Sequence, residues 1–193
     1  MAIVETPEPE QPLRGSGRAP VTRVGRTVHR PVGPWTPAVH ALLRHLEDVG
    51  FDAAPRVLGI DAEGREVLTF VDGEDGHHAR TAALHDDNAL AAVGQLIRRF
   101  HDSVAGFVAP ADATWQFLPN APRGGIVCHN DLAPVNTLYV DGRPRAFIDW
   151  DFAAPAPPEW DLACAAWSFV PLYDDDYCRR YAYPAAPRGP RLR

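Results

Sequence analysis

Two short stretches of this chain combine residue types that could transfer a phosphoryl group. His129 and Asp131 are separated by one residue, Asn136 follows Asp131 by five positions, and Asp149 comes after a short intervening segment. Phosphoryl transfer needs one carboxylate to orient an acceptor hydroxyl. It also needs an amide oxygen and a second carboxylate to hold Mg²⁺ on the phosphates of a nucleotide. No other part of the sequence points to a reaction as strongly.

The segment between Asn136 and Asp149 predicts a hairpin. Its dipeptide Asp141-Gly142 is flanked by two apolar-rich runs, which is a strong short-range hairpin signal. With these two residues in the turn, Asn136 is expected opposite Phe147. Because alternate side chains of a strand share one face, Asn136 and Asp149 are then predicted on one side of the hairpin mouth.

Asp131 is expected in a loop, because Pro134 prevents a regular helix there. It is the candidate for the group that orients the proton of an acceptor hydroxyl. His129 is expected to brace this loop by hydrogen bonding rather than to perform chemistry. A His-x-Asp triplet often occurs by chance, whereas three linked elements in this order and spacing do not, so phosphoryl transfer is favoured over a purely structural interpretation.

The first half of the chain predicts a small β-rich unit that would carry part of the site. Two short strand-like runs are joined at Gly25, and a helix is expected to begin at Thr36-Pro37, where a capping hydroxyl precedes a proline. Gly50 marks the end of that helix. The expected strands are residues 21–24, 26–30, 56–60 and 66–71.

The second half predicts helices around the loop and the hairpin. Residues 86–105 place apolar side chains on one helical face, and a second helical run is expected beyond Asp161. Near the N-terminus, Gly15-Ser16-Gly17 could approach a phosphate or could be a flexible linker.

Taken together, these segments resemble the aminoglycoside phosphotransferase family, whose kinase-like members phosphorylate hydroxyls of small molecules. The resemblance rests on His129-Asn130-Asp131 with Asn136, and on residues 148–153 and 158–163. It implies an α+β, protein-kinase-like fold of two lobes, with a small β-rich N-lobe and a mainly helical C-lobe. By the same resemblance Asp131 is the catalytic carboxylate, Asn136 and Asp149 hold the metal, and Asp161 stabilises the lower lobe.

The resemblance also divides the chain into segments. We expect residues 1–17 to be disordered, residues 18–73 to form the N-lobe with the lobe connector, and residues 74–183 to form the C-lobe. Residues 184–193 are a tail rich in proline and arginine. Related enzymes generally continue with further helices, so the C-lobe is expected to be incomplete and to expose a surface for self-association.

The resemblance places the nucleotide between the lobes. Arg30 is the match for the strand cation that contacts phosphates, with arginine replacing the usual lysine. The following helix offers His40 and Glu47 but no glutamate in its first turns, which leaves the partner of Arg30 open. The connector is expected to meet the nucleotide base through backbone groups; its members are Thr69, Phe70 and Val71.

Bulk properties agree with a cytoplasmic protein. The chain is 46% hydrophobic and 23% charged, and its formal charge of −6 argues against nonspecific binding of nucleic acid. Its three cysteines suggest neither a disulfide framework nor a metal pair. No basic region is followed by an apolar run, and no stretch is long and apolar enough for a membrane span.

The leading hypothesis is therefore a kinase that uses ATP, or another nucleoside triphosphate, with Mg²⁺. Its acceptor would be a small-molecule hydroxyl, as in aminoglycosides, choline-like amines, amino alcohols or sugars. A catalytically weak or inactive nucleotide-binding module is the alternative. A hydrolase using Cys128 and His129 is disfavoured, because adjacent strand residues point to opposite faces.

Overall fold

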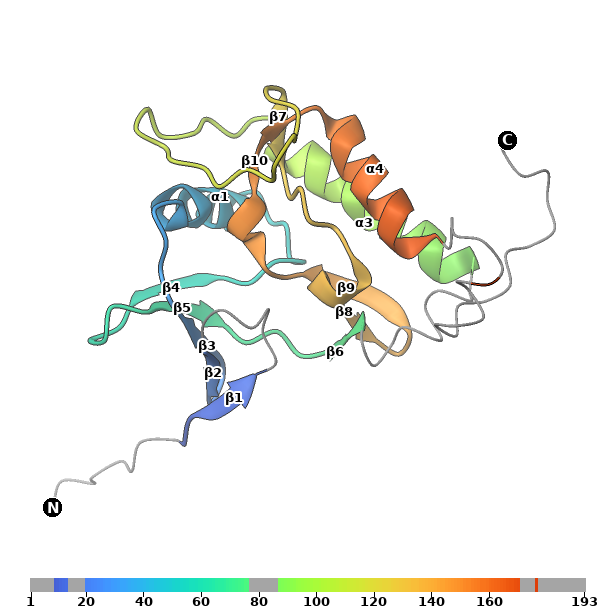
Figure 1. Cartoon of the computed structure of the whole chain (residues 1–193). Coiled ribbons are helices and arrows are strands. Elements are labelled where there is room, and N and C mark those ends of the chain that lie inside the picture. The colour runs from blue at the N-terminus through green and yellow to red at the C-terminus, as the bar shows by residue number, and fades with distance from the viewer. Residues whose placement is uncertain (1–8, 14–19, 77–86, 171–175, 177–193) are drawn as a thin grey trace, which may run out of the picture.

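The computed structural model describes residues 9–13, 20–76, 87–170 and 176 of the 193-residue chain. In Figure 1 the strand-rich N-terminal part lies at the lower left, and the part in which two long helices lie side by side next to a hairpin lies at the upper right. We call them the upper part (N-lobe) and the lower part (C-lobe). The helices are α1 (Thr36–Asp48), α3 (Asp87–Val104) and α4 (Pro158–Phe169), with short 3₁₀ turns η1 (Pro134–Asn136) and η2 (Trp150–Phe152). The strands are β1 (Gln11–Leu13), β2 (Val21–Val24), β3 (Thr27–Arg30), β4 (Val57–Ile60), β5 (Glu66–Thr69), β6 (Glu74–Asp75), β7 (Ile126–Cys128), β8 (Thr137–Val140), β9 (Arg143–Phe147) and β10 (Ala154–Ala156).

The upper part is an antiparallel sheet in the order β1-β2-β3-β5-β4. The predicted hairpin of β2 and β3 turns at Gly25, whose φ of 55° suits glycine. The predicted disorder of residues 1–17 is wrong for Gln11–Leu13, because this segment forms β1 and pairs with β2. Leu13 lies opposite Val21, and Pro12 is tolerated because an edge strand needs no N–H from it. The Gly15-Ser16-Gly17 segment lies outside the described residues.

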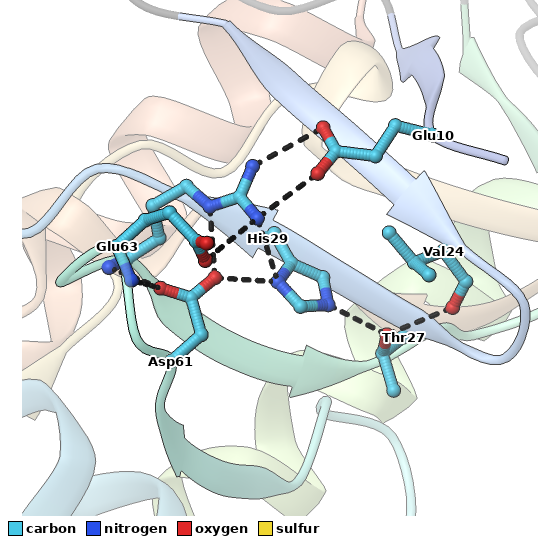
Figure 2. A network of polar contacts seen from close by, with 7 residues as sticks. Glu10, Val24, Thr27, His29, Asp61 and Glu63 are labelled. Atoms are coloured by element: carbon cyan, nitrogen blue, oxygen red, sulfur yellow. Dashed lines mark hydrogen bonds and ion pairs between the residues drawn. The ribbon is translucent and has the colours of Figure 1, made fainter. Parts of the chain in front are cut away.

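A polar network on the outer face of this sheet ties β1 to the turn between β4 and β5 (Figure 2). Glu10, next to β1, accepts hydrogen bonds from Arg65 at 3.0 and 3.2 Å. Asp61 accepts from Arg65 Nε and pairs with His29 Nδ1, each at 2.8 Å. Burial alone would raise the pKa of Asp61, but the hydrogen bonds from His29 and Arg65 lower it well below its usual range. The network therefore anchors the edge strand that the sequence did not predict.

Helix α1 joins the sheet to the lower part of the molecule. It begins at Thr36, as predicted, but the Thr36 hydroxyl accepts a hydrogen bond from the Gly33 N–H at 2.9 Å instead of capping the helix amides. Phe51, just after the helix, stacks at a tilt on Phe100 of α3, with ring centroids 6.0 Å apart. Both lobes thus share one hydrophobic core, to which α1 contributes Val39, Leu42, Leu43 and Leu46.

The lower part is built around α3, α4 and the short strands. Helix α3 matches the predicted helix within a residue at each end. Helix α4 begins at Pro158, before Asp161, so Asp161 lies in its first turn. Phe100 of α3 packs edge-on against Trp150 at 5.1 Å, while Leu162 of α4 is 51% exposed. No helix in the described part of the chain is both long and apolar enough to cross a bilayer.

The hairpin of β8 and β9 forms where it was predicted, but its register is one residue different near the mouth. Val140 pairs with Arg143 around the Asp-Gly turn, and the register then shifts between Leu138 and Tyr139. As a result Asn136 lies opposite Ile148, whose N–H donates to the Asn136 carbonyl at 2.9 Å, and not opposite Phe147. Pro144 has no N–H for the ladder, and a bulge beside it accounts for the shift.

Candidate active site

A cleft of about 260 Å³ lies between the upper sheet and the β8–β9 hairpin. Val21 and Val28 line its sheet side, and Leu138 and Ile148 line its hairpin side. The predicted connector residues Thr69, Phe70 and Val71 form one wall, while Arg30 and Asp149 form polar parts of the lining. An apolar slot with a few polar groups is suited to a flat ring attached to a charged group.

The amides of the connector are not equally available to a ligand. The Thr69 N–H donates to the Arg56 carbonyl at 2.9 Å, and the Phe70 N–H donates to the Arg26 carbonyl at 2.8 Å. Both donors are therefore used inside the upper lobe. Among the described residues, Val71 is the connector residue whose N–H makes no hydrogen bond, so it is the donor left for a nucleotide base.

Asp131 and Asn136 contact each other directly at the loop that follows β7. Asn136 Nδ2 donates to the Asp131 carbonyl at 2.9 Å and to Asp131 Oδ2 at 2.8 Å. Because the amide nitrogen faces Asp131, Oδ1 is the Asn136 atom left for a cation. Burial raises the pKa of Asp131, while His129 and the hydrogen bond from Asn136 partly oppose that rise.

The loop backbone is held by Asp161, which is completely buried. Its carboxylate accepts the His129 N–H at 3.0 Å and the Asn130 N–H at 2.7 Å. His101 Nε2, from α3, lies 2.9 Å from the same carboxylate. Asp161 thus connects α4, α3 and the loop that carries Asp131. A histidine near the end of a helix gave no sequence signal for this contact.

The side chain of His129 is fully buried and is not among the residues that line the cleft. Its Nε2 donates to the Ile148 carbonyl at 3.1 Å, and its Nδ1 accepts the Asp131 N–H at 3.4 Å. The ring also lies 4.6 Å from that of Trp150. With one nitrogen donating and the other accepting, the imidazole links the loop to the residue before Asp149, a geometry suited to bracing.

Asp149 reaches the same region through its backbone conformation. Its φ of 62° and ψ of 69° are left-handed, which few residues other than glycine and asparagine adopt readily. The chain therefore leaves strand geometry just after β9. The Asp149 side chain is 37% exposed and lines the cleft. With Asn136 Oδ1 it offers two oxygen ligands, the donor type that Mg²⁺ prefers.

Arg30 contacts three acidic side chains, one of which, Asp149, lines the cleft. Its Nε contacts Glu66 Oε1 at 2.9 Å, its Nη1 contacts Asp149 Oδ1 at 3.3 Å, and its Nη2 pairs with Asp151. Burial opposes the charge of Arg30, but Asp151, Glu66 and Asp149 together raise its pKa. The other oxygen of Glu66 accepts from His40 Nε2 at 2.8 Å.

Glu66, His40 and Asp151 are site residues that the sequence did not assign. The strand β5, not the helix, supplies the carboxylate that pairs with Arg30. A signal existed, because Arg30 and Glu66 face each other directly in the β3–β5 ladder. Opposite charges at facing positions of a predicted pair of strands would have suggested this contact.

Cys128 lacks the environment of a nucleophile. It is fully buried, and its Sγ lies 3.4 Å from the Ala156 carbonyl. Burial, together with nearby Asp161, raises the pKa of the Cys128 thiol far above its usual range. The thiolate is therefore disfavoured, and the Cys-His hydrolase hypothesis loses its nucleophile.

Cys128 should resist alkylation by iodoacetamide in the folded protein and react only after unfolding. The physical reason is the combination of complete burial and a protonated thiol. Peptide mass spectrometry of protein labelled with and without urea would measure this. Rapid labelling of Cys128 without urea would contradict the geometry described above.

The chain is similar to several known proteins. Residues 104–192 match the model of the phosphotransferase enzyme family. A trifolitoxin immunity protein of Rhizobium leguminosarum bv. trifolii is 40% identical over 173 residues, which cover 87% of this chain and 65% of that protein. The chain thus spans about two thirds of the length of this curated relative.

Several solved structures superpose on most of the chain. The GDP complex of aminoglycoside 2'-phosphotransferase-IIIa matches with a TM-score of 0.61 and 15% identity, over 88% of this chain and 75% of that one. A choline/ethanolamine kinase family protein from Mesorhizobium loti matches with a TM-score of 0.56 and 18% identity, over 93% and 71%. At such low identity the likeness concerns the fold, and it confirms the predicted α+β, kinase-like arrangement.

Proposed function

Because residues 104–192 match the model of the phosphotransferase enzyme family, we propose that the chain transfers the γ-phosphoryl group of ATP, or of another nucleoside triphosphate, to a hydroxyl of a small molecule. Two contacts support this proposal, and the residues of one of them, Arg30 and Asp149, line the cleft. Asp131 is hydrogen-bonded to Asn136, and Arg30 contacts Asp149. A carboxylate near an acceptor, two oxygen ligands for a cation and one cation for phosphates are the parts that phosphoryl transfer needs.

Each residue has a role in this proposal. Asp131 orients the acceptor hydroxyl and takes its proton as the phosphoryl group is transferred. Asn136 and Asp149 would hold Mg²⁺, which neutralises charge on the phosphates when it is bound. Arg30 contacts the phosphates, and the Val71 N–H contacts the nucleotide base. Most of the rate enhancement would come from positioning and charge neutralisation.

Thermal unfolding with ATP, in the presence and absence of Mg²⁺, tests the nucleotide site. A ligand that binds the native state stabilises it by about 2.7 kcal/mol at 100 times its Kd. We expect a Mg²⁺-dependent rise in Tm that is lost in Asp149→Asn. Asp112→Asn, which removes an exposed carboxylate on a loop, is the matched control and should keep the rise. A folded wild-type chain with no shift at any ATP concentration would contradict the proposal.

The inactive nucleotide-binding module remains the alternative function. It predicts the same rise in Tm but no transfer of phosphate to any hydroxyl acceptor. Incubating the chain with labelled ATP and a panel of amino alcohols, sugars and aminoglycosides distinguishes the two, since labelled acceptor forms only with an active enzyme. The chain is also 40% identical to a trifolitoxin immunity protein.

That identity also suggests a biological role, namely protection of a cell from a toxin by phosphorylation of a hydroxyl. We expect cells that express the wild-type chain to survive trifolitoxin at concentrations that kill control cells. Cells that express Asp131→Asn at equal abundance should die as the controls do, because the reaction would be lost. Equal protection by both forms would show that protection does not depend on phosphoryl transfer.

We also propose a cytoplasmic location, supported by the unpaired thiols of Cys128 and Cys164. Self-association through the lower lobe stays a prediction. The half-exposed Leu162 of α4 marks the surface on which to test it.

A further inference from the structure

The orientation of the Arg30 guanidinium is set from the upper lobe. Arg30 on β3 and Glu66 on β5 face each other in the ladder, and Arg30 Nε lies 2.9 Å from Glu66 Oε1. The two side chains are only 15% and 4% exposed. Because Glu66 engages the Nε side of the planar fork, the two Nη groups point toward Asp149 and Asp151 at the cleft.

Glu66 is itself held from the helix. His40 Nε2, on α1, donates to Glu66 Oε2 at 2.8 Å, and the His40 side chain is 8% exposed. A buried carboxylate is costly unless its oxygens have partners. Arg30 satisfies one oxygen of Glu66, and His40 satisfies the other. Without His40, Glu66 would lose the contact that fixes its rotamer and, through it, the direction of Arg30.

We propose that His40 and Glu66 are positioning residues that orient Arg30 toward the phosphates and thereby set the affinity for the charged part of the nucleotide. This inference rests on the proposed function. It assigns to α1 a hydrogen-bond donor, His40, where the first turns of the helix have no glutamate, and to β5 the carboxylate. The position of α1 is then coupled to phosphate binding through an imidazole.

Arginine is the side chain that this arrangement requires. Its fork can contact Glu66 through Nε while it presents two further N–H groups to the cleft. A lysine has one nitrogen and could not orient in the same way toward a strand carboxylate and a phosphate. The replacement of lysine by arginine and the transfer of the acid from helix to strand therefore belong together.

Calorimetric titration with ATP and Mg²⁺, and separately with adenosine, tests the inference. His40→Ala should weaken ATP binding about tenfold, as expected for a lost hydrogen bond to a charged group, and leave adenosine binding unchanged. His40→Gln, which retains a side-chain N–H, should restore most of the affinity for ATP. When His40→Ala is added to Arg30→Ala, it should cause little further loss of ATP affinity, because His40 acts on ATP binding through Arg30.

His45→Ala is the matched control in the same helix. His45 Nε2 donates to the Ser103 carbonyl at 2.9 Å, and the His45 ring packs on Phe107. His45 therefore takes no part in the contacts that lead from α1 to Arg30. It should leave the ratio of ATP to adenosine affinity unchanged, whatever its effect on Tm. Glu66→Gln, which preserves shape, gives a second measurement if His40→Ala does not fold, and should also weaken ATP selectively.

Three results would overturn the inference. Equal losses of ATP and adenosine affinity in His40→Ala and Glu66→Gln would indicate a general structural role. Unchanged ATP affinity in both His40→Ala and Glu66→Gln would show that Arg30 needs no positioning. Failure of the wild-type chain to bind ATP would overturn the proposed function together with this inference, whereas the first two results leave the proposed function intact.

Discussion

Replacing Asp131 with asparagine should lower the rate of phosphoryl transfer about 10²- to 10⁴-fold and leave the affinity for Mg²⁺ and ATP near that of the wild type. Asparagine keeps an oxygen for the hydrogen bond from Asn136 Nδ2, which measures 2.8 Å in the native chain. It cannot take the proton of an acceptor hydroxyl. Steady-state kinetics would show a loss in kcat, and calorimetry would show unchanged nucleotide binding.

The same substitution should not destabilise the fold. Burial raises the pKa of Asp131, so the folded chain disfavours the ionised form that is present at neutral pH. The charge therefore costs stability, fully at pH values above the raised pKa, and this cost shrinks as the pH falls from the raised pKa to the usual pKa of aspartate. Asp131→Asn should keep or raise Tm at pH 7. A variant with near-normal turnover would remove Asp131 from the reaction.

The pH dependence of the wild type follows from the same shift. If the ionised carboxylate is the active form, kcat/KM falls as the pH falls through a pKa above the usual range of aspartate. The acid limb should therefore lie at a higher pH than an exposed aspartate would give. A flat profile across the acid range would argue against a role for the ionised side chain.

Replacing Asp161 with alanine should cause the largest loss of stability among these variants, about 3–5 kcal/mol in the free energy of unfolding. The substitution removes a fully buried carboxylate that accepts the N–H groups of His129 and Asn130. It leaves these two amides and His101 without their partner inside the protein. Turnover should fall with stability, because the amides belong to the loop that carries Asp131.

Urea unfolding measures this effect, with Glu159→Ala as the control. Glu159 lies in the first turn of the same helix but is exposed, so its removal should change stability by about 0.5 kcal/mol or less. The stability of Asp161→Asn should fall between that of the wild type and that of Asp161→Ala. The single side-chain oxygen of asparagine can accept only some of the hydrogen bonds that the Asp161 carboxylate accepts. A loss below about 1 kcal/mol for Asp161→Ala would mean that the loop holds its conformation by other contacts.

Local signals in the sequence were sufficient for the elements and for the order of the reactive residues. The Asp141-Gly142 turn predicted the hairpin, the apolar spacing of residues 86–105 predicted α3, and Gly25 predicted the turn between β2 and β3. Each of these signals depends on neighbours within one turn or one helix. Such interactions are nearly independent of the rest of the fold, and so they can be recognised in the sequence alone.

The tertiary structure decided which distant residues complete the cleft. The strand β1 pairs with β2 and is tied to the β4–β5 turn by the contact between Glu10 and Arg65. The hairpin register depends on where the bulge beside Pro144 is accommodated. Glu66 reaches Arg30 only once β3 and β5 pair. These contacts join residues far apart in sequence, and their energies exist only after the lobes have packed. The sequence by itself therefore determined the kind of chemistry and its local frame, while packing determined which buried charges compensate one another.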